Sequence, residues 1–503
     1  RTLGIHRYAE KYAADHFQKN PQRVQKALKA YLSGLNAFVA SGATPIEFTL
    51  LGIPKREYKI DDLVCIAAYM SYTFTNAVRQ DPLISHIHKT FGSSYLKDLA
   101  INWPAGDTQI KVSKNQSSED LELAALFLGM DNVLAQIPPF FGSNSWVVSG
   151  SRTKSGKVIF ANDPHIGYAA PATWYEAHLK TPEWELYGHH IAGIPFAILG
   201  HNRRMAWGVT MLQNDDLDYY REQANPANPD QVWFRDHWED LKIIEETISI
   251  KGGDDISLRV RISRHGPIIN DVLESVEKTE SHPVALAWEM LADYENSTEQ
   301  VFYDLGHSNS LEDSQTAVSK LHAPGLNINY GDAEGNIAWW AAARLLIRPS
   351  HVNSFIILDG ASGKDEVLGY HDFSGNPQSV NPQSGMVFNG NNQPEDMGSG
   401  LEPGYYAPQE RAQRMSQLLD PDKDDWTAAD MQQIQLDTKH PRIENFRQHF
   451  LTVLSENSGR GEVFRNAAEV FKNWDGTHKR NAIGATIFHR LFYHLSISIF
   501  ADE

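Results

Sequence analysis

The sequence is short of the residues on which several classes of protein depend. Its one cysteine, Cys65, cannot form an internal disulfide, and it cannot build a cysteine cluster for zinc. No stretch reaches the roughly 18 consecutive apolar residues of a membrane-spanning helix, so we expect no membrane segment. Only 45 basic residues stand against 63 acidic ones, and the net charge of −18 argues against nucleic-acid binding.

What remains is an ordinary globular composition. Of the 503 residues, 41% are hydrophobic and 21% are charged, which excludes disorder, collagen and coiled coil for the chain as a whole. The chain starts at Arg1 without a charged-then-apolar leader. We therefore expect it to be processed or truncated at its start, and truncated at its end, where SISIFADE follows a helical run.

Hydrophobic periodicity predicts helices at both ends and strands between them. A helix is expected from Asn20 as its cap to Gly42 as its stop, and another over 63–74. Short strands separated by Gly, Pro and Asn begin at Ser143. The remaining expectations are a small all-β excursion over 231–275, helices over 297–306 and 311–322, a hairpin around 332–335, and helices again from 409.

The Gly142–Ser143 bond is the most informative position. A serine nucleophile needs an adjacent base, and the sequence has no Gly-x-Ser-x-Gly elbow. A serine at a chain terminus has its own α-amine, whose pKa of about 7.7–8.0 makes it a base at neutral pH. Ser143 would become such a nucleophile only after the bond before it is cut. Taken alone, however, Gly-Ser-Asn-Ser is typical of a turn rather than of a nucleophile.

Three further groups of residues have a chemical interpretation and a structural one. His165 ends a strand, where it can hydrogen-bond a nucleophile or simply be a satisfied histidine. Asp215, Asp216 and Asp218 suit a hard cation such as Ca²⁺, or form a solvated acidic loop. Asn391 in FNGNN can donate to a developing oxyanion, or serve only as a turn residue.

A series of motifs, taken together and in order, resembles the penicillin acylase (penicillin amidase) family of N-terminal-nucleophile hydrolases. The motifs are SNSWVVSG, ANDPHIG, GHNRRMAWGVT with NDDLD, NINYGDAEGNIAWW and NPQSGMVFNGNNQP. The family also includes cephalosporin and acyl-homoserine-lactone acylases. The resemblance implies an α+β fold, an αββα sandwich, and one precursor cut into an α/β heterodimer. Residues 1–106 would be the α-chain part, 107–142 a spacer and 143–503 the β-chain. Family members work in the periplasm or outside the cell.

The resemblance also implies roles for catalytic residues. Ser143 would be the nucleophile and, through its amine, the base. The backbone N–H of Met211 and the side chain of Asn391 would form the oxyanion hole. His165 would hydrogen-bond near Ser143, and Arg411 would order the active-site loop.

A calcium ion and an acyl pocket are implied in the same way. One Ca²⁺ would bind oxygen donors at Asp215, Asp218, the carbonyl of Leu217, Gln80 and Glu402. At position 80 the family has a glutamate, whereas this chain has Gln80 with Asp81 beside it. Four positions would line the acyl pocket, or belong only to the core: Met70, Phe74, Ile166 and Leu199. Because they contain a single ring, they favour an aliphatic acyl group.

The sequence therefore supports an autoprocessed amidohydrolase that cleaves the amide bond of N-acylated small molecules. An acyl-homoserine-lactone acylase is the alternative within the family. A non-catalytic calcium-binding homologue is the alternative from another class, and the joint presence of Ser143, Asn391 and Arg411 argues against it.

Overall fold

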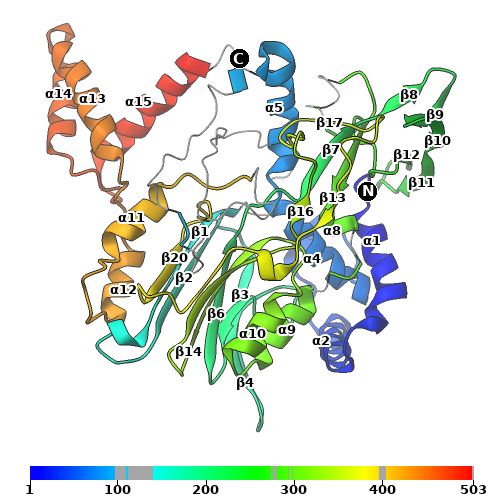
Figure 1. Ribbon diagram of the computed structural model, residues 1–503, viewed down its shortest axis with the longest axis horizontal. Coiled ribbons are helices and arrows are strands. Elements are labelled where there is room, and N and C mark those ends of the chain that lie inside the picture. The colour runs from blue at the N-terminus through cyan, green and yellow to red at the C-terminus, as the bar shows by residue number, and fades with distance from the viewer. Residues whose placement is uncertain are drawn as a thin grey trace.

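Helices occupy both ends of the chain and strands its middle (Figure 1). The computed structural model describes residues 1–93, 95–96, 109–111, 140–273, 276, 280–292, 294–296, 298–395 and 404–500. The helices are α1 Ile5–Lys11, α2 Gln22–Ser41, α3 Ile46–Leu51, α4 Ile60–Phe74, α5 Ala77–Phe91, α8 Glu289–Ala292, α9 Thr298–His307, α10 Leu311–Val318, α11 Glu410–Leu418, α12 Ala428–Gln435, α13 Ile443–Glu456, α14 Glu462–Asn473 and α15 Ile483–Phe500.

The strands follow one another closely through the middle of the chain. They are β1 Phe140–Val148, β2 Ile159–Ile166, β3 Trp174–Lys180, β4 Glu185–Ile191, β5 Leu199–His201, β6 Met205–Met211, β7 Leu217–Arg221, β8 Gln223–Asn225, β9 Asn228–Phe234, β10 His237–Asp240, β11 Lys242–Ile248, β12 Ile256–Ile262, β13 Val284–Trp288, β14 Leu326–Asp332, β15 Ile337–Ala342, β16 Leu346–Ile347, β17 Leu358–Asp359, β18 Gly369–Tyr370, β19 Gln378–Val380 and β20 Met386–Asn389.

The predicted helices are confirmed, with small changes at their ends. The first long helix, α2, ends at Gly42 as expected, but its N-cap is Pro21 rather than Asn20. Asn20 instead donates through its amide nitrogen to the Tyr12 hydroxyl at 2.8 Å, which fixes the chain before the helix starts. Helix α10 ends at Val318, four residues earlier than expected.

An antiparallel seven-stranded sheet forms the centre of the molecule, in the order β19-β15-β14-β6-β5-β4-β3. The predicted hairpin is its β14–β15 pair, in which Gly331 faces Ile337. One face of this sheet carries Trp207, Ile328 and Trp340 and packs in one core with helices that include α4, α9 and α10.

A smaller antiparallel sheet, in the order β2-β1-β20, lies on the opposite face of the large one. Successive side chains of a strand point to opposite faces, so β1 packs on both sides. Val147 packs against Trp339 of the large sheet, while Trp146 packs against α11 and α12, where Met415 and Met431 lie. Figure 1 shows α11 and α12 beside β1, β2 and β20. The strand that carries Ser143 is thus held between two layers.

Two appendages extend from opposite sides of this core (Figure 1). Strands β8 to β12 form the predicted all-β excursion, with β11 and β12 paired along their whole length. Helices α13, α14 and α15 enclose a separate apolar cluster around Phe471 and Trp474. Neither appendage contributes a side chain to the cavity described below.

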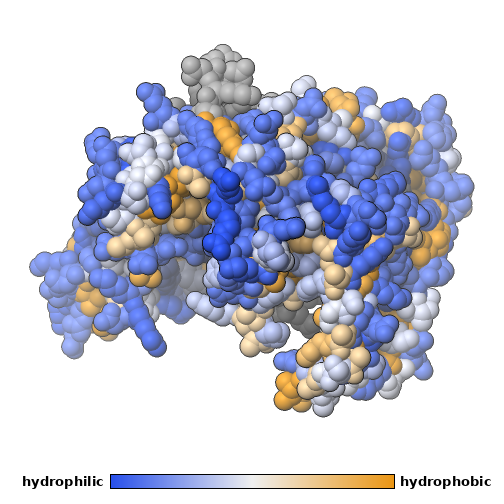
Figure 2. Space-filling view, turned by 90° about the horizontal axis from the view of Figure 1, so that it is seen from below, coloured by the Kyte–Doolittle hydropathy of each residue, from blue (hydrophilic) through white to orange (hydrophobic). Residues whose placement is uncertain are grey.

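The surface is mainly hydrophilic, as expected for a globular composition. Hydrophilic side chains cover most of the face in Figure 2, and apolar side chains appear there in separate patches. Among the described residues, no helix has the length and apolarity that a membrane crossing requires. Cys65 is a free, partly buried thiol.

Candidate active site

The Gly142–Ser143 peptide lies within β1, where the register with β2 shifts between Phe140 and Gly142. Ser143 is 2% exposed and faces Pro164 across the pair of strands. Gly142 has a φ of +148°, and a Cβ added there would lie 2.7 Å from Arg411 Nη2. Only glycine therefore lets the arginine approach the bond before Ser143 so closely.

The side chain of Asn391 makes four hydrogen bonds to described residues, two of them to Ser143. Its Nδ2 donates to Ser143 Oγ at 3.1 Å and to the Met211 carbonyl at 2.9 Å. Its Oδ1 accepts from the Ser143 backbone N–H at 2.6 Å and from Arg411 Nη2 at 2.8 Å. Asn391 is fully buried and has a φ of +66°, a left-handed conformation that asparagine tolerates better than most residues. The amide is thus held in one orientation beside the serine.

Arg411, at the start of α11, reaches the same peptide from the helical layer. Its Nη1 donates to the Ser143 carbonyl at 2.6 Å and to Asn144 Oδ1 at 2.8 Å. Burial lowers the pKa of the guanidinium to about 10, while Asp163 and Glu410 oppose that shift. At neutral pH it remains charged and fixes the peptide plane that follows Ser143.

His165 does not contact Ser143 directly. Its Nε2 lies 3.0 Å from Asp163 Oδ2 and 3.5 Å from Asn144 Nδ2, and its side chain is 32% exposed. Because Asn144 Oδ1 accepts from Arg411, the histidine reaches the serine only through Asn144 and the arginine.

An almost wholly apolar cavity opens beside Ser143. Met70 and Phe74 line it as expected, whereas Ile166 and Leu199 are not among its lining residues. Ile198, which precedes β5, lines the cavity instead of Leu199. Ile166 lies two residues beyond the lining Pro164. The full lining is Ala67, Met70, Phe74, Ser143, Pro164, Trp174, Ile191, Ile194, Ile198, Val209, Thr210, Met211, Thr298, Phe302, Pro324 and Leu326.

Asp215 and Asp218 lie in a buried cluster near the end of the Met211 strand, and the third carboxylate there is Asp81 rather than Gln80. Burial, followed by repulsion from Asp215, raises the pKa of Asp81, which accepts a hydrogen bond from the Tyr405 hydroxyl. Arg348 lies between the other two, with Nη2 3.3 Å from Asp215 Oδ2 and Nε 3.0 Å from Asp218 Oδ2.

The donor set of this cluster suits a hard cation. One oxygen of each carboxyl group, namely Asp81 Oδ2, Asp215 Oδ1 and Asp218 Oδ1, is buried without a hydrogen-bond partner among the residues that the structure describes. Three carboxyl groups share one guanidinium, so ionising all three would leave negative charge uncompensated, and burial accordingly raises the pKa of Asp81 and of Asp215, the latter to about 7. Even so, no three metal-binding side chains of the described ranges converge on one point. The residues thus supply the right oxygens without forming a finished metal site.

The predicted spacer and Glu402 stay largely untested. Glu402 and most of 107–142 lie outside the described residues. Of the spacer, Ile110 pairs through its backbone with Gln393 and Glu395, and residues 140–142 belong to β1.

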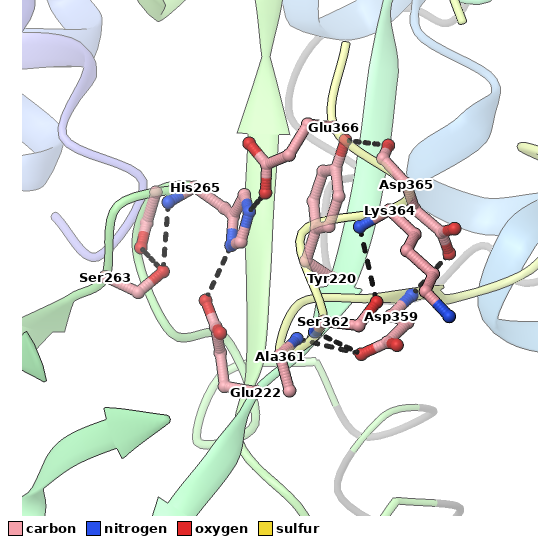
Figure 3. Close-up of polar contacts among 11 residues, drawn as sticks. Tyr220, Glu222, Ser263, His265, Asp359, Ala361, Ser362, Lys364, Asp365 and Glu366 are labelled. Carbon is pink, nitrogen blue, oxygen red and sulfur yellow. Dashed lines mark hydrogen bonds and ion pairs between the residues drawn. The ribbon is translucent and has the colours of Figure 1, made fainter. Parts of the chain in front are cut away.

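A second buried cluster lies away from Ser143, where the β excursion joins the core (Figure 3). His265 is held between two carboxylates, with Nδ1 2.9 Å from Glu222 Oε1 and Nε2 2.9 Å from Glu366 Oε1. Its ring stacks on Tyr220 at 4.0 Å between centroids. Burial lowers the pKa of His265, but the hydrogen bonds to Glu222 and Glu366 outweigh it and raise the pKa overall. The His265 side chain thus fastens the excursion to β7 and to the loop after β17.

Sequence comparisons identify the family of the chain. The penicillin amidase family profile matches residues 1–503. The acyl-homoserine lactone acylase QuiP of Pseudomonas aeruginosa is 26% identical, over 83% of this chain and 50% of its own length. The penicillin acylase 2 proenzyme of a Pseudomonas species is 25% identical, over 97% of this chain and 62% of its own. The penicillin G acylase of Escherichia coli is 28% identical, over 72% of this chain and 42% of its own.

A structural comparison finds the same fold in a solved penicillin G acylase. A thermostable penicillin G acylase from Alcaligenes faecalis superposes with a TM-score of 0.57 at 22% identity, covering 67% of this chain and 60% of that one, which shows a shared fold. The chain spans about half the length of the curated relatives that it matches. Because the family profile matches it from end to end, the chain belongs to the penicillin amidase family.

Proposed function

We propose that this chain is the precursor of an N-acyl amidohydrolase in which Ser143 becomes an N-terminal nucleophile. The observation that carries the proposal is the double contact between Ser143 and Asn391, beside an apolar cavity. Asn391 Oδ1 accepts a hydrogen bond from the Ser143 backbone N–H at 2.6 Å, and Asn391 Nδ2 donates one to Ser143 Oγ at 3.1 Å. A non-catalytic binding protein would not require this pairing.

Maturation would begin with attack of Ser143 Oγ on the Gly142 carbonyl carbon. The carbon–nitrogen bond breaks, the Ser143 nitrogen takes the proton, and Gly142 is left as an ester on the serine oxygen. Water then hydrolyses this ester to give a carboxylate at Gly142 and a free Ser143 with an α-amine. Arg411 and Asn391 would hold the peptide in position for the attack.

Turnover would use the new amine as the base. It accepts the Oγ proton while Oγ attacks the acyl carbonyl of the substrate, and the oxyanion is stabilised by Met211 N–H and Asn391 Nδ2. The leaving amine takes the proton as the carbon–nitrogen bond breaks. Water, activated by the same α-amine, then hydrolyses the acyl-enzyme. Each oxyanion donor is expected to contribute about 10²–10³ in rate.

The fold and assembly follow from the same proposal. The helical layer, the two packed sheets and the second helical layer correspond to an αββα sandwich of the N-terminal-nucleophile type. Residues 1–106 and 143–503 would form the two chains, with 107–142 excised. We place the mature heterodimer in the periplasm or outside the cell, as for the family that the sequence resembles.

The cavity favours an aliphatic acyl group. Eight of its lining residues are aliphatic or Met, against three aromatic rings at Phe74, Trp174 and Phe302. Each buried methylene contributes about 0.8 kcal/mol, so about two additional methylenes should raise kcat/KM about tenfold until the cavity is full. N-acyl homoserine lactones are the second candidate substrates, alongside β-lactam amides, because relatives named for that activity match most of this chain.

A calcium ion is part of the proposal. Asp81, Asp215 and Asp218 would bind it through their unpartnered oxygens, and the carbonyl of Leu217 would be a fourth donor. The ion would supply charge compensation and tie β7 to α5. It would not touch the substrate.

The proposed function is tested with purified full-length protein. Intact mass and N-terminal sequencing show whether a chain beginning SNSW is produced. The mature protein is then assayed on butanoyl to dodecanoyl homoserine lactones and on phenylacetyl and aliphatic β-lactam amides. A protein that hydrolyses none of them contradicts the proposal, and a flat acyl series with phenylacetyl fastest contradicts the aliphatic pocket.

A further inference from the structure

A network of buried amides lies behind Ser143 and uses residues to which the catalytic scheme assigns no role. Asn327, on β14, is 0% exposed. Its Nδ2 donates to Thr210 Oγ1 at 3.0 Å and to the Met211 carbonyl at 2.9 Å. Its Oδ1 accepts from Trp339 Nε1 at 2.9 Å. Every hydrogen of this amide is used, and its orientation is fixed because a flipped amide would face two acceptors with its oxygen.

The two acceptors of Asn327 flank a single peptide unit. Thr210 precedes the amide that links residues 210 and 211, and the Met211 carbonyl follows it. Thr210 Oγ1 in turn donates to Asn389 Oδ1 at 2.5 Å, so its side chain is held from both sides. The Met211 carbonyl also receives Asn391 Nδ2 at 2.9 Å. The side chain of Asn327 therefore hydrogen-bonds on both sides of the Met211 N–H, to the Thr210 hydroxyl and to the Met211 carbonyl.

We propose that Asn327, oriented by Trp339, is a positioning residue that aims the Met211 N–H at the oxyanion. The inference rests on the proposed amidohydrolase function. A donor contributes to the transition state only if it is preorganised, and a displacement of about 1 Å can cost about 10²-fold in rate. Asn327 touches no reacting atom and acts only through the 210–211 peptide.

The test compares two isosteric substitutions. Asn327→Asp places a carboxylate oxygen against Thr210 Oγ1 and the Met211 carbonyl. Asn376→Asp is the matched control, because Asn376 is also buried and its Nδ2 also donates two hydrogen bonds, in this case to the backbone carbonyls of Ala341 and Ala343, each at 2.9 Å. Melting temperature, the rate of precursor cleavage, and kcat and KM of the mature enzyme are measured for both.

We expect both variants to lose stability, and only Asn327→Asp to lose kcat, by about 10–100-fold with KM within about twofold of the wild type. The reason is that the oxyanion is present in the transition state and absent from the bound substrate. An Asn327→Asp enzyme with wild-type kcat, or an equal loss of kcat in Asn376→Asp, would overturn the proposal.

A second pair covers the case in which Asn327→Asp does not fold or mature. Trp339→Phe keeps a six-membered aromatic ring and removes the five-membered part of the indole, including the N–H that orients Asn327. Trp340→Phe is its control, since Trp340 is equally buried and its Nε1 has no hydrogen-bond partner. We expect a severalfold fall in kcat for the first and none for the second; equal kcat values would refute the role of Asn327. Inactive wild-type protein would instead refute the proposed function itself.

Discussion

Replacing Gly142 with alanine should slow maturation without harming the mature enzyme. The added Cβ would lie 2.7 Å from Arg411 Nη2 and 3.1 Å from Asn391 Oδ1, two groups that hold Ser143. One of them has to move, and their mutual hydrogen bond of 2.8 Å is then weakened. The backbone is also strained, because a φ of +148° is a conformation that alanine rarely adopts.

The size of the effect follows from these two costs. A hydrogen bond to a charged group is worth about 1.5–3 kcal/mol, and a sparsely populated backbone conformation costs about 1–3 kcal/mol. If about 2 kcal/mol is carried into the transition state for cleavage, the rate falls about 30-fold. Residue 142 is not part of the mature β-chain, so the fraction that does mature should have the wild-type kcat.

The assay is a time course of the intact masses of precursor and products, with kcat measured on the purified mature fraction. Gly156→Ala is the matched control, because Gly156 also has a positive φ, +67°, but an added Cβ meets no atom within 4 Å. It should lower stability without slowing cleavage. If Gly142→Ala were cleaved at the wild-type rate, Arg411 and Asn391 would not lie as close to residue 142 as the structure indicates.

Three further predictions concern stability and substrate. The His265→Gln variant should lose most unfolding free energy below pH 6.5, and the loss should shrink as the pH rises through the raised folded-state pKa of His265. Urea titrations from pH 6 to 9 measure this loss, and a loss that is constant over that range would contradict a charged imidazole. Asp215→Asn should abolish any rise in melting temperature on adding Ca²⁺ while leaving kcat of mature enzyme within about twofold, and a wild type unaffected by Ca²⁺ or chelator would contradict the calcium proposal. Ile198→Trp should lower kcat/KM for dodecanoyl amides at least about tenfold more than for butanoyl amides, since the ring would occupy the cavity; equal losses would place Ile198 outside the acyl site.

Much of the fold was predictable because its signals are local. The periodic apolar residues of α2 and α4 and the short segments between turns predict their elements directly. Local patterns did not give the end of α10 or the cap of α2, where contacts made by neighbouring segments decide the boundary. The pairing of β1 with β20, about 240 residues apart, has no local signal at all.

The site was predictable only in part. Resemblance placed Ser143, Asn391 and Arg411, and the structure brings these three together. It did not find Asn327, whose one signal is an amide that stands between the apolar residues Leu326 and Ile328 in a fully buried strand. A buried polar residue of that kind needs partners, but the sequence does not say which strand provides them.

The central claim is that Ser143 cuts its own chain and then acts from the new terminus. The most direct measurement is the intact mass and N-terminal sequence of the wild type and of Ser143→Ala, expressed and purified in parallel. We predict two chains for the wild type, one beginning SNSW, and a single uncut, inactive chain for the variant. A Ser143→Ala protein that is still cut between residues 142 and 143, or an uncut wild type with full amidohydrolase activity, would contradict the account.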